Sequence, residues 1–333
     1  MIEDLLANGI WVAIIFIIVG FVALVKGADC LVDGASSIAK RFGISDLVIG
    51  LTVVAFGTSM PEFVVNMVSV GEGSTDLAIT NILGSNIINT LVILGVTALI
   101  FPIASQKHSR NFDIPMSIFA GIFVLGAILI HAPFLSSADG GIGRLGGILL
   151  LLFFIYFLYE TFRHAKDHPS EVPSDEGQST KEMSVRRAIC LVLGGLVGLV
   201  VGGELIVKSA VDLATRLGVS QAIIGLTVVA LGTSLPELAT SIIAAYKHNS
   251  DIALGNVIGS NIFNVFFVLG ASATIRPLPT YDGIALDACV AALGSIVVWI
   301  AVKTDKGHKI NRWAGAVLLL IYGGYLTYRL LNV

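Results

Sequence analysis

Two stretches of the chain decide the fold: residues 50–62 read GLTVVAFGTSMPE, and residues 225–237 read GLTVVALGTSLPE. Eleven of these thirteen positions are identical, at a constant offset of 175 residues. The same offset places residues 81–89 (NILGSNIIN) on residues 256–264 (NVIGSNIFN), with six of nine positions identical. Chance does not produce such a register over this length, so the chain is one unit duplicated.

The composition is that of a membrane protein. Of the 333 residues, 55% are hydrophobic and only 13% are charged, whereas soluble domains carry roughly a quarter charged residues. Several apolar runs approach the ~20 residues that a spanning helix needs. The alternating segments of a β-barrel are absent, and lipid offers the backbone no hydrogen-bond partners, so we predict an all-α integral membrane protein. The start of the chain lacks a basic region and a cleavage site, so we expect the first span to be retained.

We predict ten transmembrane helices in two five-helix repeats, separated by the polar stretch KDHPSEVPSDEGQSTKEM at 166–183. The predicted units are a first repeat at 1–164 with its motif at 50–89, a linker at 165–185, and a second repeat at 186–333 with its motif at 225–264. The predicted spans are 8–40, 47–70, 77–102, 114–131, 143–163, 186–215, 222–246, 252–275, 283–303 and 312–331. Because five is odd, the second repeat enters the membrane from the opposite side, and the repeats are inverted.

Basic residues orient these spans. Fourteen Lys and Arg lie in one set of loops and at the linker, and four lie in the other set; the remaining two, Lys26 and Lys208, lie within spans. Since cytoplasmic loops are enriched in Lys and Arg, we expect the linker in the cytoplasm and both termini outside, in a prokaryotic cell membrane.

The repeated motif places polar groups, a proline and a carboxylate in mid-span. Thr58 and Glu62 are four residues apart and share a helix face with Ser59 beside them. Pro61 cannot donate a backbone hydrogen bond, so carbonyls nearby, including that of Ala55, can turn inward as ligands. The second repeat supplies the equivalent residues Ala230, Thr233, Ser234 and Glu237. An ionisable residue at membrane depth marks a functional site by default, and a Glu bonded between helices is the structural alternative.

The following helix of each repeat carries a second polar row. Asn81, Ser85 and Asn89 are spaced by four and lie on one ridge. Their counterparts are Asn256, Ser260 and Asn264. These side chains either ligate an ion or form interhelical hydrogen bonds, and both roles are compatible. Asp29 and Glu204, equivalent acids in the first helix of each repeat, either line an access path or lie near the membrane surface.

The pooled ligands are carboxylates, hydroxyls, amide oxygens and carbonyls, without thiolate or imidazole. Such an all-oxygen site suits a hard cation, Ca²⁺ or Na⁺. Two glutamates carry a charge of −2 when ionised, which one Ca²⁺ or two Na⁺ neutralise. We therefore expect ions as substrates, no cofactor and no catalysed reaction. The Gly-rich pairs lack the context of a nucleotide site, and the only other partner expected is the lipid bilayer, without nucleic acid.

The paired GxTxxAxGTSxPE and GSN segments resemble the two alpha repeats of the calcium/cation antiporter superfamily, in its prokaryotic sodium/calcium exchanger branch. The resemblance covers the whole chain and implies Na⁺/Ca²⁺ antiport by alternating access, with the long first and sixth helices sliding past a core of helices 2, 3, 7 and 8. Glu62 and Glu237 fall on the central ligand positions. The flanking ligands implied by the resemblance are Thr58, Ser59, Thr233, Ser234, the carbonyls of Ala55 and Ala230, and Ser85, Asn89, Ser260 and Asn264.

Two departures from the family pattern matter. Some exchangers, including potassium-dependent ones, have Asp at one of the last two amide positions, whereas this chain has Asn89 and Asn264. The linker is also far too short for the regulatory domains of animal exchangers. Two alternatives stay open: H⁺/Ca²⁺ antiport, because close carboxylates raise each other's proton affinity, and a passive channel or sensor, against which the inverted repeats argue.

Overall fold

The structure is a computed structural model that describes residues 9–130, 141–167, 183–218 and 230–331. Within these residues the chain is helical apart from two short strands and the connecting turns. The first half comprises α2 (Ile10–Phe42), α3 (Asp46–Ile49), the π-helix η1 (Gly50–Val54), α4 (Ala55–Thr58), α5 (Met60–Glu72), α6 (Thr75–Ile87), η2 (Ile88–Ile93), α7 (Leu94–Ile100), β1 (Ile103–Ala104), η3 (Ser109–Asp113), α8 (Ile114–Ile130) and α9 (Arg144–Asp167). The second half comprises α10 (Val185–Arg216), α12 (Ala230–Thr233), α13 (Leu235–Tyr246), α14 (Ser250–Ile262), η5 (Phe263–Leu269), α15 (Gly270–Ile275), α16 (Ile284–Thr304), β2 (Lys309–Ile310) and α17 (Arg312–Leu331).

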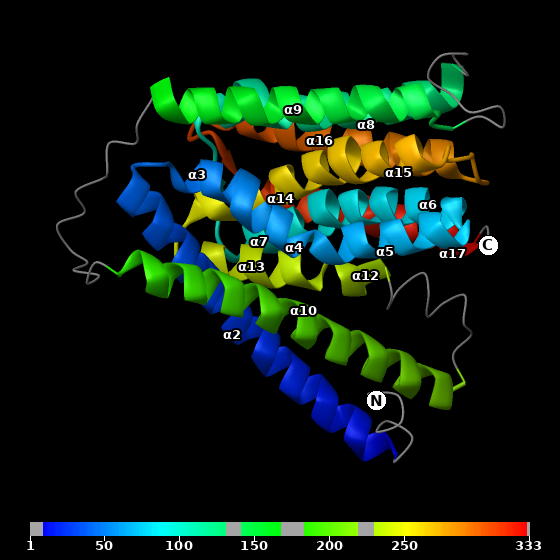
Figure 1. Ribbon diagram of the computed structural model, residues 1–333, viewed down its shortest axis with the longest axis horizontal. Coiled ribbons are helices and arrows are strands. Elements are labelled where there is room, and N and C mark those ends of the chain that lie inside the picture. The colour runs from blue at the N-terminus through cyan, green and yellow to red at the C-terminus, as the bar shows by residue number, and fades with distance from the viewer. Residues whose placement is uncertain (1–8, 131–140, 168–182, 219–229, 332–333) are drawn as a thin grey trace.

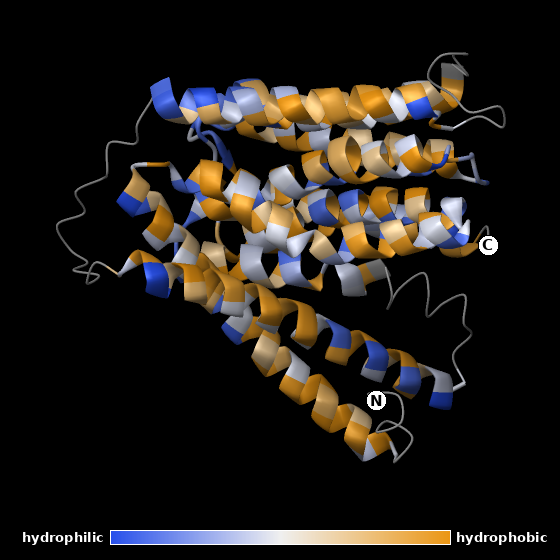
Figure 2. Ribbon diagram, in the orientation of Figure 1, coloured by the Kyte–Doolittle hydropathy of each residue, from blue (hydrophilic) through white to orange (hydrophobic). Residues whose placement is uncertain are grey.

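The helices form a bundle with its polar interior at the repeated motifs. In Figure 1, α8 and α9 lie along one side, α2 and α10 cross obliquely on the other, and α5, α6, α13, α14 and α15 lie between them. Apolar residues cover most of the outer helices (Figure 2). The continuous helix Ser250–Ile275 is almost entirely buried, and α17 is mostly exposed. The helix that carries the Asn and Ser row of the second repeat therefore lies at the centre.

The predicted all-helical membrane fold is confirmed. Among the described residues, eight helices are long and apolar enough to cross a membrane, and the bent pair 46–58 and 60–72 adds a ninth. These nine correspond to nine of the ten predicted spans. The remaining span, 222–246, lies partly outside the described residues, which include α12 and α13 from it.

Two predicted boundaries differ from the structure. The fourth span is helical from Ser109, not only from residue 114, and α9 continues to Asp167, beyond the predicted start of the linker. The apolar run defines the part of a helix within hydrocarbon, but the backbone hydrogen bonds that define the helix continue into the polar interface. Hydropathy therefore underestimates helix length at these ends.

The bundle has two ends, and the loops sort between them. We call the end at which α9 stops and α10 begins the linker end, and the end at which α2 begins and α17 stops the terminal end (Figure 1). At the linker end, β1 pairs antiparallel with β2. At the terminal end, Ile142 and Leu278 exchange two backbone hydrogen bonds of 2.9 Å. Loops of the two halves thus meet at both ends.

The repeats are antiparallel. The chain of α4 and α5 runs toward the terminal end, whereas that of α12 and α13 runs toward the linker end (Figure 1). The broken segments of the two repeats consequently run in opposite directions through the middle of the bundle (Figure 1). This is the inverted arrangement that the odd number of spans predicts.

Glycines allow the two longest helices to pack backbone to backbone. A Cβ added at Gly195 of α10 would lie 2.7 Å from the carbonyl oxygen of Gly27 in α2, and one added at Gly202 would lie 2.6 Å from that of Gly20. The contacts recur every seven residues, two helical turns, and only a residue without a side chain fits there. The pair α2 and α10 is therefore a unit joined along most of its length.

Candidate functional site

The helix of each repeat breaks just before its glutamate. In the first repeat, the axes of 46–58 and 60–72 differ by 45°. The break falls at Ser59 (φ −85°, ψ 8°) and, in the second repeat, at Ser234 (φ −89°, ψ 6°). Pro61 and Pro236 occupy the first turn of the helix that follows, where a missing N–H costs nothing. The predicted interruption is confirmed in both repeats, with the same backbone geometry.

Both glutamates are fully buried in the middle of the bundle. The Ser59 hydroxyl of the first repeat donates to Glu237 Oε1 at 2.8 Å, and the Ser85 hydroxyl lies 3.4 Å from Glu62 Oε1. Because the bond from Ser59 crosses between the repeats, the two motifs form one site.

The hydroxyl of Thr58 also crosses between the repeats. Its Oγ1 lies 3.0 Å from Asn256 Oδ1 and 3.3 Å from the carbonyl oxygen of Ala55. The amide of Asn256 in turn donates to the Glu237 carbonyl at 3.2 Å and to Ser241 Oγ at 2.9 Å. Asn256 therefore ties the broken helix of each repeat to α14.

The first repeat has an equivalent amide network that includes a residue we did not predict. Asn81 Nδ2 donates to Asn66 Oδ1 at 2.9 Å, and Asn66 Nδ2 donates to the Ala78 carbonyl at 3.0 Å. Asn66 is the repeat counterpart of Ser241. Both are polar residues in apolar helices, four residues after a site glutamate, and that spacing is the signal that could have identified them.

Asparagines of the two GSN segments bond to each other across the bundle. Asn264 Nδ2 donates to Asn86 Oδ1 at 3.1 Å, and Asn86 Nδ2 donates to the Asn261 carbonyl at 3.2 Å. Asn261 Nδ2 donates to Thr90 Oγ1 at 2.7 Å. The interhelical hydrogen bonds that were the alternative to ligation are thus present at these residues.

π-Helices η2 and η5 occupy equivalent positions, and each begins two residues after the end of a GSN segment. Each widens the helix at the final amide, Asn89 or Asn264. Such π-turns are rare and recur at functional sites. The sequence shows no breaker at either position, so this irregularity was not predictable from composition.

Several buried polar atoms of the site have no hydrogen-bond partner among the described residues. They are Glu62 Oε2, Glu237 Oε2, Thr233 Oγ1, Ser234 Oγ, Ser260 Oγ, Asn264 Oδ1, and both Oδ1 and Nδ2 of Asn89. The Thr233 hydroxyl lies beside Glu62 and that of Ser260 beside Glu237. A buried polar atom without a partner is costly, and all of these except the amide nitrogen are oxygens. The donor set fits a hard cation as a transported substrate.

The two carbonyl positions differ in what the structure describes. The Ala55 carbonyl accepts the backbone N–H of Ser59 at 3.0 Å and lies 3.3 Å from Thr58 Oγ1, so the proline does not free it. Ala230 begins α12, next to residues outside the described part of the chain.

The described residues contain no cluster of three or more His, Cys, Asp or Glu able to hold a metal. The oxygens around the two carboxylates of the site belong to hydroxyl, amide and carbonyl groups. Such ligands favour Ca²⁺ or Na⁺ over zinc or copper.

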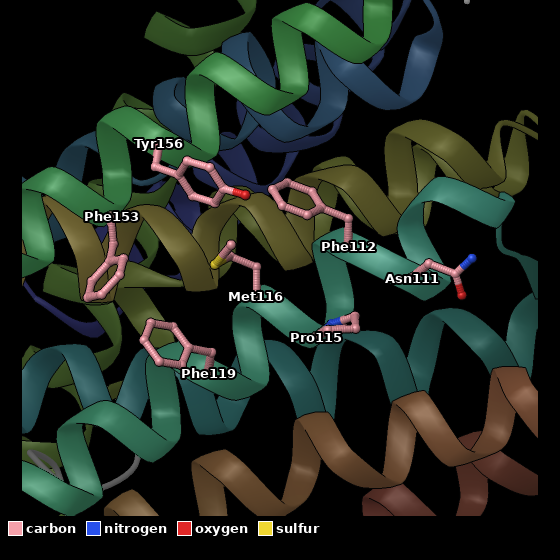
Figure 3. Close-up of a pocket in the computed structure, with 7 residues that line it drawn as sticks. All are labelled: Asn111, Phe112, Pro115, Met116, Phe119, Phe153 and Tyr156. Carbon is pink, nitrogen blue, oxygen red and sulfur yellow. The ribbon is translucent and has the colours of Figure 1, made fainter.

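Two surface grooves are not part of this site. One, of about 300 Å³, lies between η3, α8 and α9, and Figure 3 shows its mostly aromatic lining, including Phe112, Phe119 and Tyr156. The other, of about 280 Å³, separates Gly57 and Met60 from the apolar side chains of α10. Both are apolar and lie on spanning helices, so neither offers an ion its ligands.

Comparison with known proteins places this geometry in a family. Residues 12–162 and 187–331 match the sodium/calcium exchanger protein family. The chain belongs to this family. It is a transporter family, and the resemblance predicted from the motif pair is confirmed.

Individual relatives cover most or nearly all of the chain. The sodium/calcium exchanger MaX1 of Methanosarcina acetivorans is 33% identical, over 96% of this chain and 98% of its own length. The inner membrane protein YrbG of Escherichia coli is 37% identical, over 78% of this chain and 79% of its own length. A more distant relative, the Ca(2+)/H(+) antiporter ChaA of Bacillus subtilis, is 24% identical over 82% of this chain and 80% of its own length.

A solved structure has the same fold. That of the sodium-calcium exchanger NCX_Mj, soaked with 10 mM Na⁺ and zero Ca²⁺, matches with a TM-score of 0.79 and 32% identity, over 94% of this chain and 97% of that chain. This chain is thus an all-helical membrane protein of the same architecture as that exchanger.

Proposed function

We propose that this exchanger carries Ca²⁺ across the membrane in exchange for Na⁺, with Glu62 and Glu237 as the central ligands of both ions. One observation carries the proposal: each inverted repeat contributes one fully buried carboxylate, and the hydroxyl of Ser59 in the first repeat donates to the carboxylate of Glu237 in the second. Around them lie oxygen atoms without other partners.

Charge balance supports exchange over one-way binding. Two ionised glutamates are neutralised by one Ca²⁺ or by two Na⁺, so either load leaves the buried site near neutrality. A buried site with uncompensated charge is costly, and the protein therefore changes conformation readily only when loaded. Thr58, Ser59, Thr233, Ser234, Ser85 and Ser260, the amides Asn89 and Asn264, and the carbonyls of Ala55 and Ala230 complete the proposed coordination.

We further propose that the linker end faces the cytoplasm and that both termini lie outside. Lys and Arg concentrate in the loops that meet at the linker end, and positive charge is retained on the cytoplasmic side. The relationship to a bacterial inner membrane protein supports a cell-membrane location.

Proton-coupled Ca²⁺ antiport is the alternative, favoured by the relationship to ChaA. Paired glutamates can bind H⁺ in place of Na⁺. The test is Ca²⁺ uptake into vesicles containing the purified protein, at one fixed pH on both sides. We expect an outward Na⁺ gradient to drive uptake. In a second experiment, a pH gradient is imposed without a Na⁺ gradient. Uptake that responds to this pH gradient but not to Na⁺ would establish the alternative.

The carboxylates can be tested individually. We expect Glu62→Gln and Glu237→Gln each to abolish Na⁺-driven Ca²⁺ uptake, because either change removes one of the two charges that balance Ca²⁺. Glu160→Gln, which changes a partly exposed acid of α9 paired with Arg163, serves as control and should transport normally. Near-normal uptake by either site variant would refute the role of that carboxylate.

A further inference from the structure

An ion-pair cluster closes the linker end of α2 onto the core. The Lys247 ammonium, just after α13, lies 2.6 Å from Asp29 Oδ1 and 2.6 Å from Asp33 Oδ1 of α2. It also donates to the Asp29 backbone carbonyl at 3.2 Å. A second contact one turn away strengthens the junction, since Asn249 Nδ2 lies 3.1 Å from Ser36 Oγ of α2.

The packing of the helices differs between the two ends. α2 packs along α13 at the linker end, whereas the repeat-equivalent pair, α10 and α5, makes marginal contact at most. Figure 1 shows the terminal half of α10 diverging from α5 and α6. Among the described residues, the long helices therefore pack more closely onto the core on the linker side than on the terminal side.

The offset of 175 residues maps the Lys247 cluster onto the terminal side. Asp29 corresponds to Glu204, Asp33 to Lys208, and Lys247 to Glu72. The mapped set again contains two acids and one lysine, but their placement is exchanged. The lysine, Lys208, lies on the long helix α10, and one acid, Glu72, lies at the end of the core helix α5. Both clusters can thus hold a lysine between two carboxylates.

In this conformation Glu72 is not joined to the other two mapped residues. Lys208 Nζ binds Glu204 Oε1 of its own helix at 2.7 Å. Glu72 is exposed at the end of α5 and forms no ion pair among the described residues. The lysine is therefore already held next to one carboxylate, and Glu72 is the acid that would complete the cluster.

We propose that Glu72 and Lys208 form the ion pair that closes the terminal side, in alternation with the Lys247 cluster that closes the linker side. The glycine contacts join α2 and α10 into one unit, so a shift that separates Asp29 and Asp33 from Lys247 carries Lys208 relative to α5. The inference extends the proposed function, since it assigns the contacts that hold each of the two conformations.

The expected effect of each ion pair on the equilibrium between the two conformations is small. A partly exposed ion pair changes an equilibrium by roughly fivefold at most, and one on each side keeps both conformations accessible. A stronger pair on one side would hold the transporter in a single conformation.

The test is a distance measurement between two spin labels on the full chain in lipid. Cysteines placed at Leu217, just after α10, and at Leu331 of α17, both exposed at the terminal end, carry the labels. The native Cys30, Cys190 and Cys289 are replaced by Ser. We expect Lys247→Gln to increase the population with the shorter distance severalfold. Glu72→Gln or Lys208→Gln, added to Lys247→Gln, should reverse this increase.

The decisive variant is the exchange of charges, Glu72→Lys with Lys208→Glu, which reproduces on the terminal side the arrangement of the linker side. We expect this double change to restore the population with the shorter distance, which Glu72→Lys or Lys208→Glu alone lowers. Asp76→Asn, an exposed acid at the start of α6, is the matched control and should have no effect.

The proposal is overturned by a charge exchange that fails to restore the population with the shorter distance, or by a control that lowers that population as much as Glu72→Gln. Unchanged distances in all variants overturn it as well. The measurement does not depend on which ions are carried, so a protein without Na⁺-driven Ca²⁺ uptake would refute the proposed function but not this ion pair.

Discussion

At the scale of the residue, one hydroxyl joins the two repeats at the site. Thr58 Oγ1 lies 3.0 Å from Asn256 Oδ1, and Asn256 holds the backbone of Glu237. All three residues are buried. A change at Thr58 should therefore alter the hydrogen bonding of Asn256 in the second repeat, although Thr58 belongs to the first.

We expect Thr58→Val to lower both stability and Ca²⁺ transport. Val has nearly the same shape, but it leaves Asn256 Oδ1 buried without a donor, at a cost of about 1–3 kcal/mol. Thr58→Ser retains the hydroxyl and is the control. Melting temperature in detergent and vesicle uptake measure the two effects, and equal behaviour of the two variants would show that the hydroxyl is unimportant.

At the scale of the element, neighbouring glycines of α10 have opposite surroundings. A Cβ at Gly195 would lie 2.7 Å from the Gly27 carbonyl oxygen, whereas one at Gly194 would meet no atom within 4 Å. The chain thus provides a matched pair of substitutions in one helix turn.

We expect Gly195→Ala to separate α2 from α10, lower the melting temperature and reduce Ca²⁺ uptake. Gly194→Ala should leave transport intact and stabilise the helix by up to about 1 kcal/mol, the difference in helix propensity between Ala and Gly. If Gly195→Ala were as active and as stable as Gly194→Ala, the close approach of the two helices would have no functional importance.

At the scale of the whole molecule, the orientation in the membrane follows from the two ends of the bundle. Asp282 and Lys306 are exposed in loops at opposite ends of α16. Single cysteines at these positions, in a chain without its native cysteines, report which side each loop faces.

We expect a membrane-impermeant maleimide to label Asp282→Cys in intact cells and Lys306→Cys only after lysis, because basic loops remain in the cytoplasm. Labelling of both cysteines in intact cells would indicate leaky membranes. A cysteine at Lys107, exposed at the linker end, controls for this, because it too should be labelled only after lysis. The opposite pattern would reverse the proposed orientation.

The sequence predicted much of the fold and the central part of the site. Identity between the motifs gave the repeat, and the odd span count gave its inversion. The polar residues around Pro61 predicted the break that the structure has at Ser59. The sequence analysis missed Asn66 and Ser241. Their spacing of four residues after each glutamate places them on the same helix face, but only the structure shows that they bond to the amide row of the next helix.

By itself, the sequence determined the chemical nature of this protein: a duplicated membrane bundle with one carboxylate per repeat and oxygen ligands around them. Residue type and spacing are local properties, and they suffice for that. Only the tertiary structure decided which repeat each group acts on, as with Ser59 on Glu237 and Thr58 on Asn256. It alone also decided on which side α2 is held onto the core, since Lys247 and Asp29 are 218 residues apart and only packing brings their charges together.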